Sequence, residues 1–157
     1  MRTRLMQVFL ILAIAAFDAF GADNTLGTWK LNVAKSQSTP AAAVPFKSLS
    51  ITREASDGGV KQTSTGERAD GTAMNAGYTA KYDGKDVPVA GNPSWDTIAI
   101  KQVNANTLTE DRKKTGGPYK ATVHTVISNS GKTMTVTVKG TNADGKEFTQ
   151  VSVFDKQ

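Results

Sequence analysis

Residues 133–138 read Thr-Met-Thr-Val-Thr-Val, so threonine alternates with an apolar side chain at every step. Successive side chains of a β-strand point to opposite faces, and this alternation therefore predicts a strand with one buried face. Threonine suits the other face because its branched Cβ favours extended backbone. Similar alternation recurs at residues 121–127 and at residues 74–82. Since no sustained helical stripe accompanies it, the chain after residue 21 is predicted to be all β.

Turn signals separate these segments at nearly constant spacing. They are Asp57-Gly58, Asp70-Gly71, Asp83-Gly84, Gly116-Gly117, Ser130-Gly131 and Asp144-Gly145. Each interval fits a strand of about nine residues and a tight turn in which glycine supplies a positive φ. The pattern predicts strands at residues 26–32, 46–55, 60–68, 72–82, 85–89, 97–103, 107–114, 119–127, 133–140 and 146–154.

Such strands in sequential hairpins would leave two exposed edges in an open sheet. Closure removes the edges, so the expected fold is an antiparallel up-and-down β-barrel of about eight to ten strands. A two-sheet sandwich is the alternative, but only residues 33–45 and 90–96 are long enough to cross over or form a lid. Residues 60–68 are polar on both faces, which indicates either a partly polar interior or an edge strand. A short helical turn near residues 41–44 is also compatible with the sequence.

Residues 1–21 have the pattern of a cleaved export signal. Two arginines open the segment, residues 5–17 are almost wholly apolar, and the small residues Ala19 and Gly21 stand where signal peptidase requires them. An uncleaved anchor helix is the alternative, but the apolar stretch is shorter than the roughly 20 residues that a membrane span needs. We therefore expect a single domain at residues 22–157, periplasmic or secreted, without a transmembrane segment.

The composition excludes several kinds of chemistry. The chain has no cysteine and one histidine, His124, so disulfides, thiol catalysis and multi-histidine metal sites are excluded. His124 is expected on the outer face of a strand. Neither a catalytic constellation nor a cofactor motif is visible, so we predict no catalytic residues, no metal, no cofactor and no enzymatic activity. The net charge is +5, but basic residues are dispersed among acidic ones, and nucleic acid is not an expected partner. A monomer is expected.

Four residues are candidates for contact with a ligand. Tyr78 and Tyr82 share one strand face with Met74, which would place hydroxyl groups in a mostly apolar cavity. Ordinary core packing is the alternative. Trp95 lies in the loop of residues 91–96, where it would contact a ligand or partner, or pack as a lid on the barrel rim.

The charge run at residues 110–114 has two interpretations. A solvated edge or hairpin arm is preferred, and a site for an anionic head group is the alternative. Together these features predict a binding protein that holds a small apolar or amphipathic ligand in its barrel. The alternative is a structural or interaction protein of the cell envelope, with a filled barrel and no ligand.

Two resemblances add to this interpretation. Gly27-Thr28-Trp29, at the start of the first strand, resembles the Gly-x-Trp signature of lipocalins and related calycin barrels. The resemblance implies that Trp29 closes the barrel bottom and that a basic residue, Lys156 or alternatively Lys30, covers its ring. Residues 27–32, 34–36, 82–85, 88–89, 91–93, 96–97 and 155–157 resemble a family of small, uncharacterised exported bacterial proteins. That resemblance implies an all-β fold and export, and it does not indicate a substrate.

Overall fold

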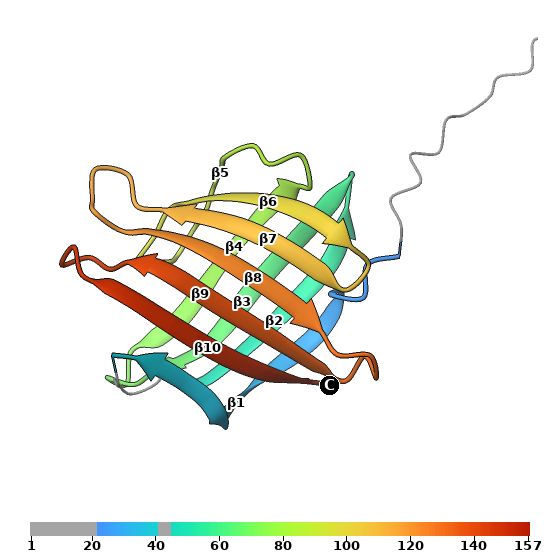
Figure 1. The fold of residues 1–157 in the computed structure, drawn as a ribbon, viewed down its shortest axis with the longest axis horizontal. Coiled ribbons are helices and arrows are strands. Elements are labelled where there is room, and N and C mark those ends of the chain that lie inside the picture. Colours follow the sequence, from blue (N-terminus) through green and yellow to red (C-terminus); the bar gives the residue numbers. More distant parts are fainter. Residues whose placement is uncertain (1–21, 41–44) are drawn as a thin grey trace, which may run out of the picture.

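The computed structural model describes residues 22–40 and 45–157. This part of the chain forms ten strands and no helix (Figure 1). The strands are β1 (Gly27–Thr39), β2 (Phe46–Ser56), β3 (Gly59–Arg68), β4 (Ala73–Lys81), β5 (Val87–Pro88), β6 (Thr97–Asn104), β7 (Thr107–Lys113), β8 (Lys120–Ile127), β9 (Thr133–Thr141) and β10 (Glu147–Lys156). The predicted export signal at residues 1–21 and the predicted helical turn near residues 41–44 lie outside the described residues.

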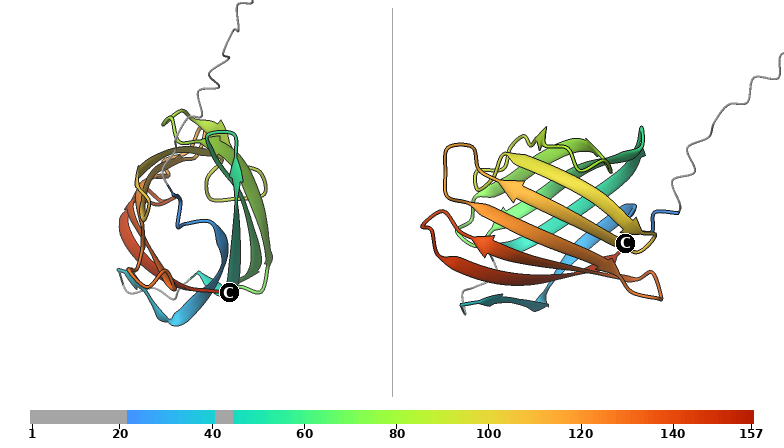
Figure 2. Two further views of the ribbon diagram at one scale, coloured as in Figure 1. Left: turned by 90° about the vertical axis from the view of Figure 1, so that its right-hand side faces the viewer. Right: turned by 45° about the horizontal axis from the view of Figure 1, so that its top comes forward.

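All ten strands belong to one antiparallel sheet that follows the chain. Its order is β4-β3-β2-β1-β10-β9-β8-β7-β6-β5, so consecutive strands are neighbours and β1 pairs with β10. The sheet curls into a nearly closed barrel, as the view along it in Figure 2 shows. The prediction of an up-and-down barrel is thereby confirmed. The sandwich is wrong because every strand of the described residues belongs to this one sheet.

The barrel is nearly closed where β4 meets the segment that follows β5. Gly77 of β4 and Ala90 exchange two backbone hydrogen bonds, each of 3.0 Å. Gly91 has a φ of +73°, and a Cβ at this position would lie 2.0 Å from the carbonyl oxygen of Asn75. A glycine is therefore required for this segment to approach β4.

The first strand is longer than the sequence predicted. β1 continues to Thr39, and after an irregularity between Asn32 and Gln37 it pairs with β10 alone. The predicted crossover or lid at residues 33–45 is therefore wrong for residues 33–39. This half of the strand is polar and mostly exposed, and the period-two pattern that marks the other strands is absent from it.

Burial follows the predicted alternation. In β8 every second residue is buried, and in β4 Met74, Ala76, Tyr78 and Ala80 are all buried. Residues 60–68 do not form an edge, because β3 lies between β2 and β4, and its inward-facing Gln62 and Ser64 are buried. The interior of the barrel is therefore partly polar. Each of the six predicted turns contains one glycine with a positive φ.

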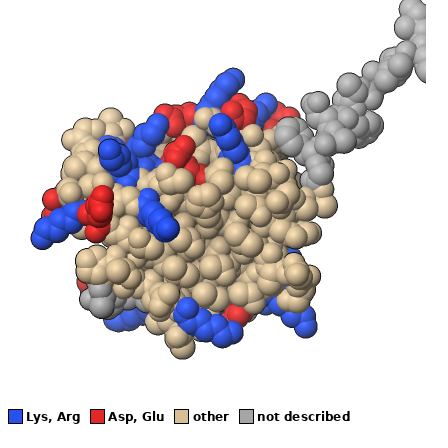
Figure 3. All heavy atoms as spheres, in the orientation of Figure 1, with Lys and Arg blue, Asp and Glu red and all other residues tan. Residues whose placement is uncertain are grey.

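The outer surface carries both signs of charge. Figure 3 shows lysine and arginine side chains interspersed with aspartate and glutamate on the face drawn, without a single continuous basic patch. His124 is exposed on this outer side of β8, as expected. In the described part of the chain, no helix is long and apolar enough to cross a membrane.

Candidate ligand-binding cavity

One end of the barrel is closed by the chain that precedes β1. Trp29 is fully buried there, and its indole N–H donates a 2.8 Å hydrogen bond to the carbonyl oxygen of Thr25. The Asn24 N–H bonds the Ala105 carbonyl oxygen across the barrel end at 2.8 Å. Figure 2 shows this segment, in blue, lying across the barrel. The resulting plug leaves the opposite end, where the β5–β6, β7–β8 and β9–β10 loops meet, as the barrel mouth.

The lysine of the last strand covers the plug. Lys156 Nζ lies 5.0 Å from the centre of the Trp29 ring, in a cation–π arrangement. Gly27 has a φ of +117°, and a Cβ there would lie 3.2 Å from Cε of Lys156. The glycine therefore makes room for the lysine stem. Lys30 pairs with Asp155 in the register and is exposed, so the structure places Lys156, and not Lys30, over the ring.

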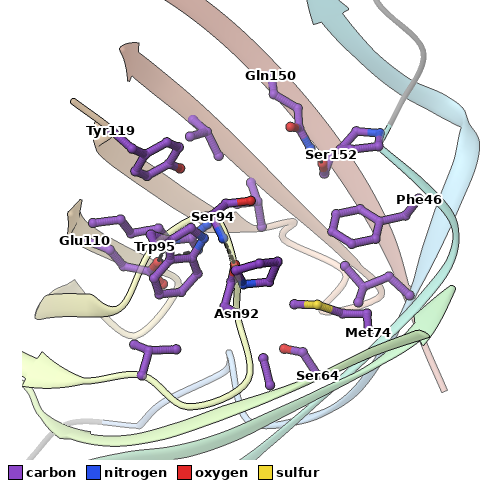
Figure 4. A pocket seen from close by; sticks show the side chains of 18 of the residues that line it. Phe46, Ser64, Met74, Asn92, Ser94, Trp95, Glu110, Tyr119, Gln150 and Ser152 are labelled. Carbon is purple, nitrogen blue, oxygen red and sulfur yellow. Dashed lines mark hydrogen bonds and ion pairs between the residues drawn. The ribbon is translucent and has the colours of Figure 1, made fainter. Parts of the chain in front are cut away.

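A cavity of about 640 Å³ fills the barrel between the plug and the mouth. This volume lies within the roughly 300–1,000 Å³ of small-molecule sites. Figure 4 shows Phe46 and Met74 on one side and Glu110 and Tyr119 on the other, with Gln150 and Ser152 on a further wall. Most of the remaining wall is apolar and comes from Leu49, Ile51, Ala76, Val89, Met134, Val136, Val138 and Phe154.

A row of polar side chains crosses the cavity wall that β2, β3 and β4 form. Arg53 of β2 lies opposite Gln62 of β3, which lies opposite Tyr78 of β4, so the three share the inner face. Gln62 Oε1 accepts hydrogen bonds from Arg53 Nε at 2.7 Å and from the Tyr78 hydroxyl at 2.9 Å. Burial raises the pKa of Tyr78 to about 12, so the phenol stays protonated at neutral pH.

The opposite wall supplies a buried ion cluster. Glu110 and Arg112 are two residues apart on β7 and therefore point to the same inner face. Glu110 Oε1 accepts from Arg53 Nη2 at 3.0 Å, and its Oε2 accepts from Arg112 Nε and Nη2 at 3.0 and 2.6 Å. The preferred interpretation of residues 110–114 as a solvated edge is thus wrong for Glu110 and Arg112. It fails because they face inward, whereas Asp111 and Lys113 between and beyond them are exposed.

The cluster carries one net positive charge. Burial alone would raise the pKa of Glu110, but attraction to Arg112 and Arg53 outweighs it and lowers that pKa. Burial alone would lower the pKa values of both arginines, and interactions with Glu110 and neighbouring tyrosines more than offset it. Two cations and one anion are therefore held inside the barrel at neutral pH.

The β5–β6 loop connects this cluster to the mouth. Trp95 lies over Arg112, whose Cζ is 4.6 Å from the ring centre. The neighbouring Asp96 carboxylate accepts hydrogen bonds from the Thr115 N–H at 2.8 Å and the Thr115 hydroxyl at 3.0 Å. Lys114 Nζ lies 3.4 Å from the same carboxylate. The loop is therefore held against the β7–β8 loop, with its tryptophan in the cavity wall.

Three of the four predicted ligand residues, Met74, Tyr78 and Trp95, line the cavity. Tyr82 does not line it. Its half-buried hydroxyl instead donates to the Asp23 carboxylate beside the plug, and burial raises its pKa. Sequence reasoning missed Arg53 and Glu110 as interior residues, and it left open whether residues 60–68, with Gln62, face a polar interior or form an edge. A signal for Glu110 was available, because it stands two residues after the apolar Leu108 and so shares its strand face. Nothing local distinguishes Arg53 from a surface arginine.

Comparison with known proteins adds no assignment. No protein-family model matches this chain, and no curated protein matches it.

Proposed function

We propose that this protein is an exported, lipocalin-like carrier, periplasmic or secreted, which binds a small amphipathic molecule without transforming it. The observation that carries the proposal is the cavity of about 640 Å³, which combines a largely apolar wall with a few convergent polar groups. Binding sites for small molecules have this composition, because apolar burial supplies affinity and polar groups fix orientation.

The residues that would contact the ligand are Met74, Tyr78 and Trp95. Met74 offers a flexible apolar surface, and Trp95 a large ring in the cavity wall. The plug formed around Trp29 and Lys156 would keep the ligand from leaving at the far end. The hollow interior favours the carrier over the alternative, a filled barrel that acts only through its outer surface.

Native mass spectrometry tests the proposal. The complete chain is expressed in a bacterium, and the purified protein is measured under native and denaturing conditions. A discrete additional mass that is lost on denaturation supports the carrier and identifies the ligand class. The bare protein mass in both spectra, together with no uptake of added amphiphiles, contradicts the carrier and favours the filled barrel. N-terminal sequencing of the same sample tests cleavage before Ala22.

A further inference from the structure

The aromatic residues of this chain are concentrated around the cavity. Of the eight aromatic side chains in residues 22–40 and 45–157, six line it, and the other two, Trp29 and Tyr82, lie at the plug. The six are Phe46, Tyr78, Trp95, Tyr119, Phe148 and Phe154. Four of these rings, which belong to Phe46, Trp95, Tyr119 and Phe148, are only half-buried. Aromatic surface is therefore left uncovered in the mouth half of the cavity.

Two of the four rings meet over a glycine. Phe148 of β10 lies opposite Gly140 of β9, which in turn lies opposite Ala121 of β8. Tyr119 stands two residues before Ala121 and therefore points to the same inner face. Because Gly140 places no side chain between them, the rings of Tyr119 and Phe148 meet across β9, with their centres 6.0 Å apart and their planes at 36°. They form one aromatic surface on this wall of the cavity.

The other two half-buried rings are already covered by cations. The Cζ of Arg68 lies 5.5 Å from the centre of the Phe46 ring, and that of Arg112 lies 4.6 Å from the centre of the Trp95 ring. No arginine or lysine of the described residues lies over either ring of the pair across β9. A cation would suit these electron-rich faces, but the net positive charge of the buried ion cluster disfavours a cationic ligand. A neutral planar ring is the occupant that the surface fits.

A hydrogen-bond donor stands at the edge of this aromatic surface. The hydroxyls of Tyr78 and Tyr82 both donate to protein side chains, whereas that of Tyr119 bonds no described residue. Water can reach it, because the closed polar atoms without a partner are Arg53 Nη1 and Thr125 Oγ1 alone among the described residues. Burial raises the pKa of Tyr119, so its phenol is a donor at neutral pH. Figure 4 shows this side chain beside the cavity, on the same side as Trp95.

We propose that the ligand of this barrel is uncharged and carries a planar conjugated ring with a carbonyl oxygen. The ring lies on Phe148 beside Tyr119, and the carbonyl oxygen accepts a hydrogen bond from the Tyr119 hydroxyl. The rest of the molecule lies against the aliphatic wall, which includes Leu49 and Met134. An aliphatic wall accepts any apolar chain of suitable length, whereas the aromatic surface and the open donor select this ring. The inference rests on the proposed function and names the ligand class of the same cavity.

Three uncharged probes of closely similar size test the proposal: phenyl heptyl ketone, cyclohexyl heptyl ketone and octylbenzene. Each is measured by equilibrium dialysis against the purified, delipidated protein, below its solubility limit. We expect the phenyl ketone to bind about fivefold or more tightly than the cyclohexyl ketone, because aromatic rings in contact gain more than their buried area provides. Burial of apolar area alone predicts no such preference, since the saturated ring buries at least as much surface.

Two variants separate the ring from the hydroxyl. Phe148→Leu keeps an apolar side chain but removes the ring, so the affinity of the phenyl ketone should fall to within about twofold of that of the cyclohexyl ketone. Tyr119→Phe keeps the ring but removes the donor, so it should weaken the phenyl ketone about fivefold and leave octylbenzene within about twofold. Tyr82→Phe is the matched control, because it removes the same hydroxyl beside the plug, outside the cavity, and should change no probe.

The outcomes are distinguishable. Equal affinity of the wild type for the two ketones, or an unchanged ratio in folded Phe148→Leu, overturns the ring site and leaves the carrier intact. Unchanged binding of the phenyl ketone in Tyr119→Phe overturns the hydroxyl contact in the same way. If Phe148→Leu does not fold, the wild-type ratio and Tyr119→Phe decide the question. A failure of all three probes to bind saturably contradicts the carrier itself.

Discussion

Replacement of Glu110 by glutamine should strongly destabilise the barrel. The carboxylate is 1% exposed and accepts three hydrogen bonds from two arginines that are 3% and 16% exposed. The amide keeps one acceptor oxygen but turns an N–H₂ group towards the other guanidinium and leaves both cations uncompensated. Breaking a buried ion pair costs about 3–5 kcal/mol, and the remaining acceptor places this variant near 3 kcal/mol.

Urea unfolding followed by circular dichroism measures the loss. With a slope of about 2 kcal/mol per molar, a loss of about 3 kcal/mol lowers the midpoint by roughly 1.5 M. Asp111→Asn is the matched control, because its exposed carboxylate lies next in the strand and accepts a 3.2 Å bond from Thr122 alone. It should stay within about 0.5 kcal/mol of the wild type.

The same pair of proteins has a defined pH dependence. The pKa of Glu110 is lowered from its ordinary value of 4.5 in the folded state, so its stabilisation is fully present above pH 4.5. It is lost as the pH falls through the lower folded-state pKa. The difference between wild type and Glu110→Gln should therefore shrink below pH 4.5. Equal midpoints for wild type, Glu110→Gln and Asp111→Asn at pH 7 would refute the reasoning.

Three further predictions concern the plug and the loop. Trp29→Ala should lower the unfolding free energy by about 3–5 kcal/mol in urea, since the ring is fully buried, whereas Lys156→Ala should cost about 1 kcal/mol or less. An added amphiphile that binds in the cavity, with dodecanoate as the probe, should change the tryptophan emission of the wild type. Trp95→Phe should abolish this change while the emission of Trp29 persists. An unchanged response in Trp95→Phe would place the ligand elsewhere. Asp96→Ala should speed hydrogen exchange of the Thr115 amide severalfold, because the carboxylate accepts a hydrogen bond from this amide. The Thr115 hydrogen bonds lower the pKa of Asp96 from its ordinary value of 3.8, so the wild-type amide should lose protection only as the pH falls below 3.8. Identical exchange rates in the two proteins would count against the loop contact.

The strands and turns were predictable because their determinants are local. The alternation of threonine and apolar residues at 133–138 indicates which side chains face inward, and it does so independently of the neighbouring strands. Each turn glycine likewise supplies its positive φ within its own dipeptide. The limits of local reasoning appear in β1. Its half from residue 33 to Thr39 lacks alternation and is a strand only because β10 pairs with it.

The residues of the candidate site also divide into those that local sequence predicts and those that only the tertiary structure places. Met74 and Tyr78 were found because their stripe is inward in any barrel. The register brings Tyr82 of that stripe to the plug instead of the cavity, where Asp23 takes up its hydroxyl.

The sequence by itself determined that the chain after residue 21 is all β and that its strands follow one another in hairpins, and the resemblance to lipocalins implied that Trp29 closes the barrel. Only the tertiary structure decided that charged residues lie inside. Arg53 and Glu110 are 57 positions apart, and each alone would be placed at the surface, because an isolated buried charge is too costly. Burial of the two charges is energetically possible only because barrel closure brings β2 and β7 face to face, where Arg53 and Glu110 pair. Neither strand's own sequence indicates this pairing.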